Sequence, residues 1–222
     1  MGKLILVEGQ PGTGKSRAIL NLDPKSTLVI KPNNKDLPFQ GSRSKYKIGD
    51  NMVVTSEIRD INPLLQKANE GERFKTVIIE DFTHYLSKRV MKDAPEKGYE
   101  KWTRLAIDVF DSFLEIESRL RADLYIIVIA HSQMSKDEND VKEFALQTPG
   151  KILDNQIKIP SYFTYVLHSD VEEDENGSVR YYFLTNRDGT KREAKSPEGC
   201  LELREENDYK AIIEKIEKYQ KE

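Results

Sequence analysis

Short apolar runs alternate along the chain with segments whose hydrophobic residues recur at helical spacing. The apolar runs predict buried strands, because a strand covered on both faces shows no polar alternation. These runs are Lys3–Glu8, Thr27–Ile30, Asn51–Thr55, Thr76–Ile79 and Leu124–Ala130. The helical spacing predicts four helices, which are Gly14 or Lys15 to about Asn21, Ile58–Asn69, His84–Met91 and a long one over Trp102–Leu120.

The pattern becomes richer in strands after residue 130. Strand candidates are Val141–Leu146, Tyr162–His168 and Val179–Thr185, and the last two flank Asn176-Gly177, a hairpin signal. Asp208–Tyr219 closes the chain as an amphipathic helix. This order predicts an α/β fold with a mostly parallel sheet flanked by helices and a C-terminal antiparallel β extension.

Composition narrows the class of protein. A chain of 222 residues is long enough for one substantial core, so we expect a single domain over residues 1–222. No run approaches the roughly 18–20 apolar residues of a membrane span, and we expect no membrane partner. Cys200 is the one cysteine, as is usual in a reducing compartment, so a cytoplasmic location is expected.

Charge is unevenly distributed, although the net charge is only −3. One basic stretch contains Lys31, Lys35, Arg43, Lys45 and Lys47, and a second contains Arg187, Lys191, Arg192 and Lys195. These stretches are either solvated loops or a face that binds a polyanion.

The segment after the first strand fits the G-x-x-x-x-G-K-[ST] pattern of a phosphate-binding P-loop, between a strand and a predicted helix. Its candidate nucleotide-binding residues are Gly9, Gln10, Pro11, Gly12, Thr13, Gly14, Lys15, Ser16 and Arg17. The glycines let main-chain N–H groups converge on phosphate oxygens. Lys15 would then reach the β- and γ-phosphates of ATP, and the Ser16 hydroxyl would ligate Mg²⁺.

Two acids end the apolar run Thr76–Ile79. We assign Glu80 to the metal shell and Asp81 to its support, while the reverse assignment, or a role for one of them in polarising the attacking water, stays open. A solvated pair of acids at a strand end is the alternative without chemistry.

A polar group follows the most apolar strand. His131-Ser132-Gln133 comes directly after Leu124–Ala130, and a polar residue there, with Gln133 as our catalytic candidate, would sense the γ-phosphate and relay its loss to a loop. Simple loop polarity is the alternative.

These residues together resemble the RecA-like P-loop ATPases of bacteriophages, including single-strand annealing proteins reduced to a RecA core. Besides the P-loop, the resemblance rests on Lys35-Asp36-Leu37-Pro38-Phe39, Glu80-Asp81-Phe82, Glu96-Lys97-Gly98-Tyr99, His131-Ser132, Gly150-Lys151-Ile152-Leu153-Asp154, Asn186-Arg187-Asp188-Gly189 and Ala194-Lys195-Ser196-Pro197. These segments extend over nearly the whole chain.

The resemblance implies a single RecA-type domain that assembles into rings or filaments. Lys151 looks like the basic residue that such assemblies place against a neighbour's γ-phosphate, and Ala194–Pro197 is expected to border the adenine. Glu80 departs from the usual Asp, and no separate catalytic glutamate is evident. Glu57 is a candidate base, and hydrolysis is expected to be slow or to depend on assembly.

The first functional hypothesis is a DNA-dependent ATPase of phage recombination or replication that acts on single-stranded DNA, in the host cytoplasm. In it, basic side chains track the phosphates while Phe39, Tyr46 and Tyr99 offer stacking surfaces. A nucleotide or other small-molecule kinase and an AAA+ helicase-loader type remodeller are the alternatives.

Overall fold

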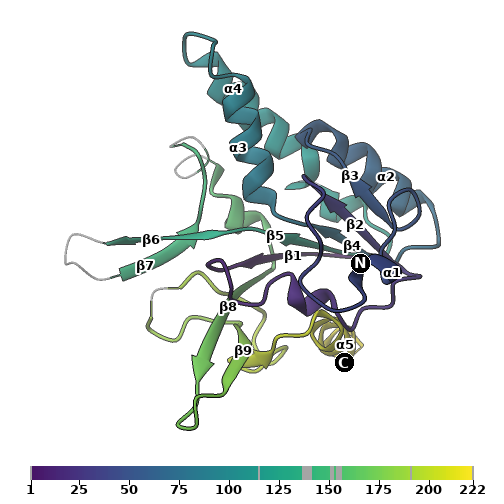
Figure 1. Ribbon diagram of the computed structural model, residues 1–222, viewed down its shortest axis with the longest axis vertical. Coiled ribbons are helices and arrows are strands. Elements are labelled where there is room, and N and C mark those ends of the chain that lie inside the picture. The colour runs from purple at the N-terminus through teal and green to yellow at the C-terminus, as the bar shows by residue number, and fades with distance from the viewer. Residues whose placement is uncertain are drawn as a thin grey trace.

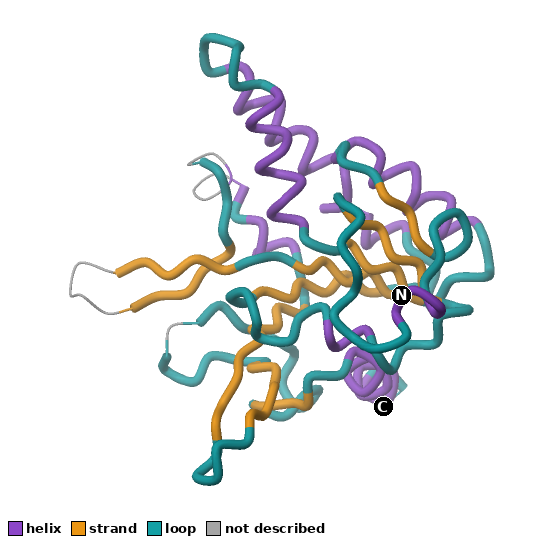
Figure 2. Tube along the Cα trace, in the orientation of Figure 1, coloured by secondary structure: helices purple, strands orange, loops and turns teal. Residues whose placement is uncertain are grey.

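The computed structural model describes residues 2–114, 116–136, 142–150, 153, 157–190 and 192–221. Its strands are β1 Lys3–Glu8, β2 Thr27–Lys31, β3 Met52–Val54, β4 Thr76–Ile79, β5 Tyr125–Ile129, β6 Ser132–Lys136, β7 Lys142–Leu146, β8 Tyr165–Glu173, β9 Val179–Leu184 and β10 Arg204–Glu206. The α-helices are α1 Ser42–Lys45, α2 Ile61–Glu70, α3 Phe82–Lys92, α4 Glu100–Val109 and α5 Tyr209–Tyr219 (Figures 1 and 2).

One large sheet organises the fold. In the part of the chain that the structure describes, its strand order is β10-β9-β8-β1-β5-β4-β2-β3. The strands from β8 to β3 in this order run parallel, and β9 and β10 extend the sheet antiparallel. The predicted mostly parallel sheet with a C-terminal antiparallel extension is confirmed, and β1 lies between two parallel neighbours.

Alternate residues of the central strands face two separate cores. Leu4 and Leu6 of β1 pack in the core that α2, α3 and α4 cover. Ile5 and Val7 pack in a second core that includes Ile212 and Ile216 of α5 (Figure 1). Because both sheet faces are covered, the strand sequences are continuously apolar, as the sequence pattern predicts.

The helix predicted after the P-loop is much shorter in the structure, where only the 3₁₀ turn Arg17–Ile19 follows the loop. The Lys15 carbonyl, which an α-helix would bond to the Ile19 amide, instead accepts a hydrogen bond from the Tyr209 hydroxyl at 2.7 Å. The Ile19 amide bonds to the Ser16 carbonyl. Tertiary contact therefore overrides the local helical pattern.

The long helix predicted over Trp102–Leu120 is also interrupted. After α4 the chain forms a π-helical turn at Phe110–Leu114 and a 3₁₀ turn at Ile116–Arg119. Further 3₁₀ turns occupy Ile58–Asp60 and Ile159–Tyr162. Phe113 and Leu114 of the π-helical turn still pack in the core.

Two strands, β6 and β10, escape prediction, whereas β7 lies within the predicted strand Val141–Leu146. β6 and β7 pair antiparallel as a separate two-stranded ribbon, which projects from the sheet beside β5 (Figure 1). β10 is only three residues long and pairs with β9. Such short strands carry too few residues for a period to show.

None of the described helices combines the length and apolar character that a membrane crossing requires.

Candidate functional site

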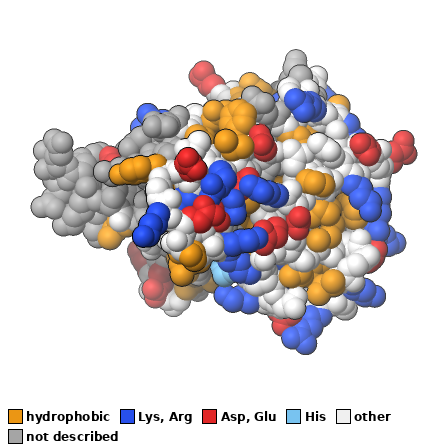
Figure 3. All heavy atoms as spheres, turned by 90° about the horizontal axis from the view of Figure 1, so that it is seen from above, with side chains coloured by type: hydrophobic (Ala, Val, Ile, Leu, Met, Phe, Trp, Pro, Cys, Tyr) orange, Lys and Arg blue, Asp and Glu red, His pale blue; other side chains and the backbone are white. Residues whose placement is uncertain are grey.

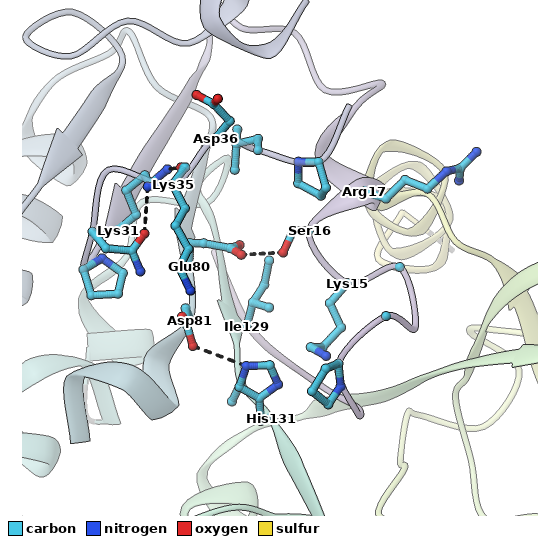
Figure 4. Close-up of a pocket in the computed structure, with 18 of the residues that line it drawn as sticks. Lys15, Ser16, Arg17, Lys31, Lys35, Asp36, Glu80, Asp81, Ile129 and His131 are labelled. Carbon is cyan, nitrogen blue, oxygen red and sulfur yellow. Dashed lines mark hydrogen bonds and ion pairs between the residues drawn. The ribbon is translucent and has the colours of Figure 1, made fainter. Parts of the chain in front are cut away.

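A cavity of about 470 Å³ opens at the carboxyl ends of β1, β2, β4 and β5. Ligands of open α/β sheets bind at this edge, because the loops that follow the strands converge there. The lining comes from the P-loop, the loop after β2 and the ends of β4 and β5, and it includes Lys15, Ser16, Lys31, Glu80, Asp81 and His131 (Figure 4).

Two P-loop glycines leave no room for a side chain. A Cβ at Gly9 would lie 2.5 Å from the Ser169 carbonyl oxygen, and one at Gly14 would lie 2.8 Å from a ring carbon of Tyr181. Gly14 also has φ of 93°, a backbone conformation that favours glycine. Both positions therefore require glycine, because β8 and β9 approach the loop closely at these two points.

Lys15 lies inside the loop, with 6% of its surface exposed. Its ammonium donates to the carbonyls of Gly9 at 2.8 Å and Gln10 at 2.6 Å, which leaves its remaining proton free for another acceptor. Burial lowers the pKa of Lys15 to about 8, although the Glu80 and Asp81 carboxylates favour its charged form. The side chain is still mainly cationic at neutral pH.

Ser16 and Glu80 meet at the centre of the cavity, where the Ser16 hydroxyl donates to Glu80 Oε1 (Figure 4). Glu80 Oε2 is buried and lacks a hydrogen-bond partner among the described residues. Burial raises the pKa of this carboxyl, and the Ser16 hydrogen bond opposes that effect. A hydroxyl beside an unpaired carboxylate oxygen fits the donor set of Mg²⁺, which takes few protein ligands and completes its shell with phosphate and water oxygens.

Asp81 lies next to Glu80 in a left-handed backbone conformation with φ of 53°. Its Oδ1 lies 3.5 Å from Nε2 of His131, and its Oδ2 lies 4.0 Å from Nδ1 of His84. Burial by itself would raise the pKa of Asp81, but the contact with His131 and the charges of His84 and Lys35 together outweigh it, and the pKa falls below the usual value. Asp81 is therefore ionised at neutral pH.

Lys31 enters the cavity from the end of β2. Its side chain is buried and its ammonium donates to the Lys35 carbonyl, which holds the loop after β2 in place (Figure 4). Burial lowers the pKa of Lys31, while Glu80 favours the charged form. Lys31 and Lys35 thus belong to the phosphate cavity instead of a separate polyanion face.

The aromatic residues of the same loop are not available for stacking on a ligand. Tyr46 is buried, and Phe39 packs edge-on against it with 6.3 Å between the ring centroids. Only Tyr99 of the three predicted stacking residues is exposed. The basic residues of this loop did not reveal that Phe39 and Tyr46 pack against the protein instead of facing solvent.

Residues from the C-terminal third of the chain donate hydrogen bonds to carbonyls of the P-loop. The Ser169 hydroxyl donates to the Thr13 carbonyl at 2.6 Å, and Tyr209 bonds to Lys15 as described above. Directly before the loop, Glu8 Oε1 lies 3.1 Å from Nδ1 of His168, and both side chains are buried. The sequence analysis missed these residues because their contacts join segments more than 150 positions apart.

Two catalytic candidates, Gln133 and Glu57, lie outside this cavity. Gln133 is exposed on β6 and lines a second cavity. Glu57 forms an exposed ion pair with Lys92 at 2.9 Å. Lys151 falls outside the described residues. The segment Ala194–Pro197 contributes Ala194 and Lys195 to the second cavity as well.

The chain resembles two archaeal proteins of known structure. The KaiC-like protein PH0186 from Pyrococcus horikoshii OT3 aligns with a TM-score of 0.44 and 14% identity, over 82% of this chain and 77% of that one. The flagellar accessory protein FlaH from Methanocaldococcus jannaschii aligns with a TM-score of 0.41 and 14% identity, over 87% of this chain and 82% of that one. Both likenesses are too distant to inform function.

A family model described as an AAA domain matches residues 1–197, while no curated protein matches the chain. The matched segment includes the P-loop, both acids at the end of β4 and His131. The chain therefore belongs to the AAA-domain family, and it is a nucleotide-binding P-loop ATPase.

Proposed function

We propose that the protein is a DNA-dependent ATPase that hydrolyses MgATP while bound to single-stranded DNA, in the recombination or replication of a phage genome. The observation that carries the ATPase part is the meeting of Lys15, Ser16 and the Glu80–Asp81 pair in one cavity. The residues that would hold the metal are Ser16 and Glu80. Bound Mg²⁺ would supply positive charge to the β- and γ-phosphate oxygens.

Lys15 and Asp81 have separate roles in the proposed reaction. Lys15 binds the phosphates and stabilises the negative charge that builds on them as the bond to the γ-phosphorus breaks. Asp81, held ionised beside His131, orients the attacking water and accepts its proton. Positioning and charge supply most of the acceleration in phosphoryl transfer, so these few groups are sufficient for slow turnover.

A basic cavity supports the DNA part of the proposal. It lies beside β6, β7 and β8, has a volume of about 470 Å³, and is lined by the cations Lys158, Arg187 and Lys195 together with Glu193. Cations grouped in a groove attract a phosphate backbone without reading its sequence. On the face drawn in Figure 3, acidic and basic side chains intermingle.

The two cavities are joined by a short stretch of chain. His131 lines the phosphate cavity and contacts Asp81, whereas Gln133, two residues further, lines the basic cavity. Between them the Ser132 amide donates to the Gly9 carbonyl at 3.1 Å. A shift of β6 on DNA binding would therefore reach both Asp81 and the start of the P-loop.

Self-association completes the proposal. RecA-type assemblies place a basic residue of one subunit against the γ-phosphate of the next, and the resemblance described above gives this role to Lys151. Such a residue supplies roughly 10³–10⁵ in rate where it has been measured in other enzymes. An isolated subunit would then bind ATP and turn it over poorly.

The decisive experiment measures phosphate release from MgATP with and without single-stranded DNA. We expect stimulation by DNA at low salt that fades as salt rises, and near-complete loss of turnover with and without DNA in Lys15→Ala. The double variant Lys158→Ala/Arg187→Ala should keep its basal rate and lose stimulation, with the slope of log affinity against log salt reduced by roughly 0.7 for each phosphate contact removed.

Lys67→Ala is the matched control, because this exposed lysine of α2 lines neither cavity. Equal loss of stimulation in the control and the double variant would reject the basic cavity as the DNA site. ATP turnover that ignores single-stranded DNA at every salt concentration would reject the DNA part of the function. Phosphate transfer to a nucleoside monophosphate instead of water would show a kinase.

A further inference from the structure

A cation–π contact forms part of the phosphate cavity wall. The guanidinium carbon of Arg17 lies 5.3 Å from the ring centroid of Tyr181, and both residues line the cavity. Arg17 comes from the 3₁₀ turn that follows the P-loop, and Tyr181 comes from β9. The two residues are thus brought together only by the fold.

The Tyr181 ring is fixed in place by the P-loop itself. Its edge packs on Gly14, where a Cβ would come within 2.8 Å of Cδ1. Neighbouring residues of β9 are held in the sheet by pairing with β8 on one side and β10 on the other. The Tyr181 ring thus lines the cavity in a fixed position, and one of its faces is covered only by the exposed Arg17 guanidinium.

Arg17 itself is weakly held. It is exposed and forms no ion pair with any described residue. Figure 4 shows its side chain extending from the loop on the side away from Glu80, Asp81 and His131. The triphosphate end of a nucleotide is expected at those acids and Lys15, so the Arg17–Tyr181 stack lies where the other end of the nucleotide emerges.

We infer that Arg17 and Tyr181 bind the base of the nucleotide, with the base stacked on the Tyr181 ring and the Arg17 guanidinium moved aside to cover the base or its α-phosphate. Recognition through the ring face favours a purine over a pyrimidine, because a larger ring system stacks over more area. It discriminates little between adenine and guanine. The inference rests on the nucleotide-binding part of the proposed function and is independent of DNA.

The test compares two ligands that share a phosphate chain. Calorimetry measures the affinity of the full chain for MgATP and for magnesium tripolyphosphate, without DNA. Stacking of a base on an aromatic side chain changes affinity by about 5- to 150-fold, so Tyr181→Ala should weaken MgATP binding by an amount in this range and leave tripolyphosphate binding unchanged. Tyr181→Phe, which keeps the ring, should bind both ligands like the unmodified chain.

The next residue of β9 offers a matched control. Arg204 stacks on Tyr182 with 4.8 Å to the ring centroid, and neither residue lines the phosphate cavity. Arg204→Ala should leave MgATP affinity unchanged, whereas Arg17→Ala should lower it by about twofold to tenfold.

Equal weakening of both ligands by Tyr181→Ala would overturn the inference, since Tyr181 would then support only the P-loop. Unchanged MgATP affinity would overturn it too. Failure of the unmodified chain to bind either ligand would instead contradict the proposed function, so the two failures are distinguishable.

Discussion

Single residues of the phosphate cavity differ in how burial acts on their charge. Burial lowers the pKa of Lys15 and raises that of Glu80, whereas the contacts of Asp81 lower its pKa in spite of burial. One carboxylate oxygen of Glu80 has no hydrogen-bond partner among the described residues, whereas Asp81 contacts His131. The two neighbouring acids are therefore suited to different tasks, which makes the assignment between them testable.

Substitution of each acid by its amide separates these tasks. We expect Glu80→Gln to weaken the Mg²⁺ dependence of ATP binding and to reduce turnover about 100-fold. Asp81→Asn should bind MgATP like the unmodified chain and lose turnover by a similar factor. Titration of ATP binding with Mg²⁺ and with EDTA checks both. Loss of Mg²⁺ dependence in Asp81→Asn alone would reverse the assignment.

The buried Glu8–His168 pair predicts a pH effect on stability. Burial, and to a lesser extent Glu193, raises the pKa of Glu8 well above its usual value, with Lys15 opposing. The unfolded chain releases this proton near pH 4.5, whereas the folded chain holds it to higher pH. The contribution of Glu8 to the stability of the folded chain therefore decreases as pH rises through that window.

Glu8→Gln removes this titration and keeps a polar partner for His168. The melting temperature of the variant minus that of the unmodified chain should therefore increase as pH rises from 4.5 to 8. His168, whose pKa burial lowers to about 4, acts in the opposite direction between pH 6.5 and 4 and is present in both proteins. A difference that stays constant with pH would contradict the prediction.

At the scale of elements, the β6–β7 ribbon connects the two cavities. Its first residues are tied to the P-loop through the Ser132–Gly9 bond, and its base is held by the bond from the Gln147 amide to the His131 carbonyl at 2.8 Å. The ribbon pairs with no strand of the main sheet within the described residues. Because Leu146 of β7 packs in the core, we expect the proposed DNA binding to bend the ribbon about this base instead of detaching it.

Gln133→Ala tests this role. Because Gln133 is exposed and lies outside the phosphate cavity, the variant should keep its basal ATPase rate and its melting temperature. The stimulation by single-stranded DNA should fall several-fold. Measurement of both rates across DNA concentrations distinguishes weaker DNA binding from weaker coupling at saturation. An unchanged maximal stimulation would remove Gln133 from the relay.

The elements also show what the sequence was able to predict. Every strand of the parallel sheet was located, because continuous apolar runs and the P-loop pattern are local signals. The prediction of a full helix after the P-loop was wrong, because the Tyr209 hydroxyl of the distant helix α5 donates a hydrogen bond to the Lys15 carbonyl. Ser169, Tyr181 and Tyr209 approach the cavity through strand order and packing, and no local pattern records which segments the sheet brings side by side.

At the scale of the whole molecule, assembly decides the rate in our proposal. ATPase activity per subunit should rise with protein concentration, while MgATP affinity stays the same. Mass measurement across the same concentrations shows whether the rise follows oligomer formation. Lys151→Ala should remove the rise, and mixing it with Lys15→Ala should restore part of the activity if Lys151 acts on a neighbour. Activity independent of concentration would contradict a role in trans.

β1 occupies a position with a consequence for how the protein responds to its ligand. Paired on both edges and covered on both faces, it belongs to the last part of the chain to open, and the P-loop is its direct continuation. Amide hydrogens of β1 are therefore expected to exchange with solvent only when the entire sheet unfolds. A nucleotide bound at the P-loop slows exchange throughout the sheet, by about 2.7 kcal/mol of added protection at a hundredfold excess over its dissociation constant.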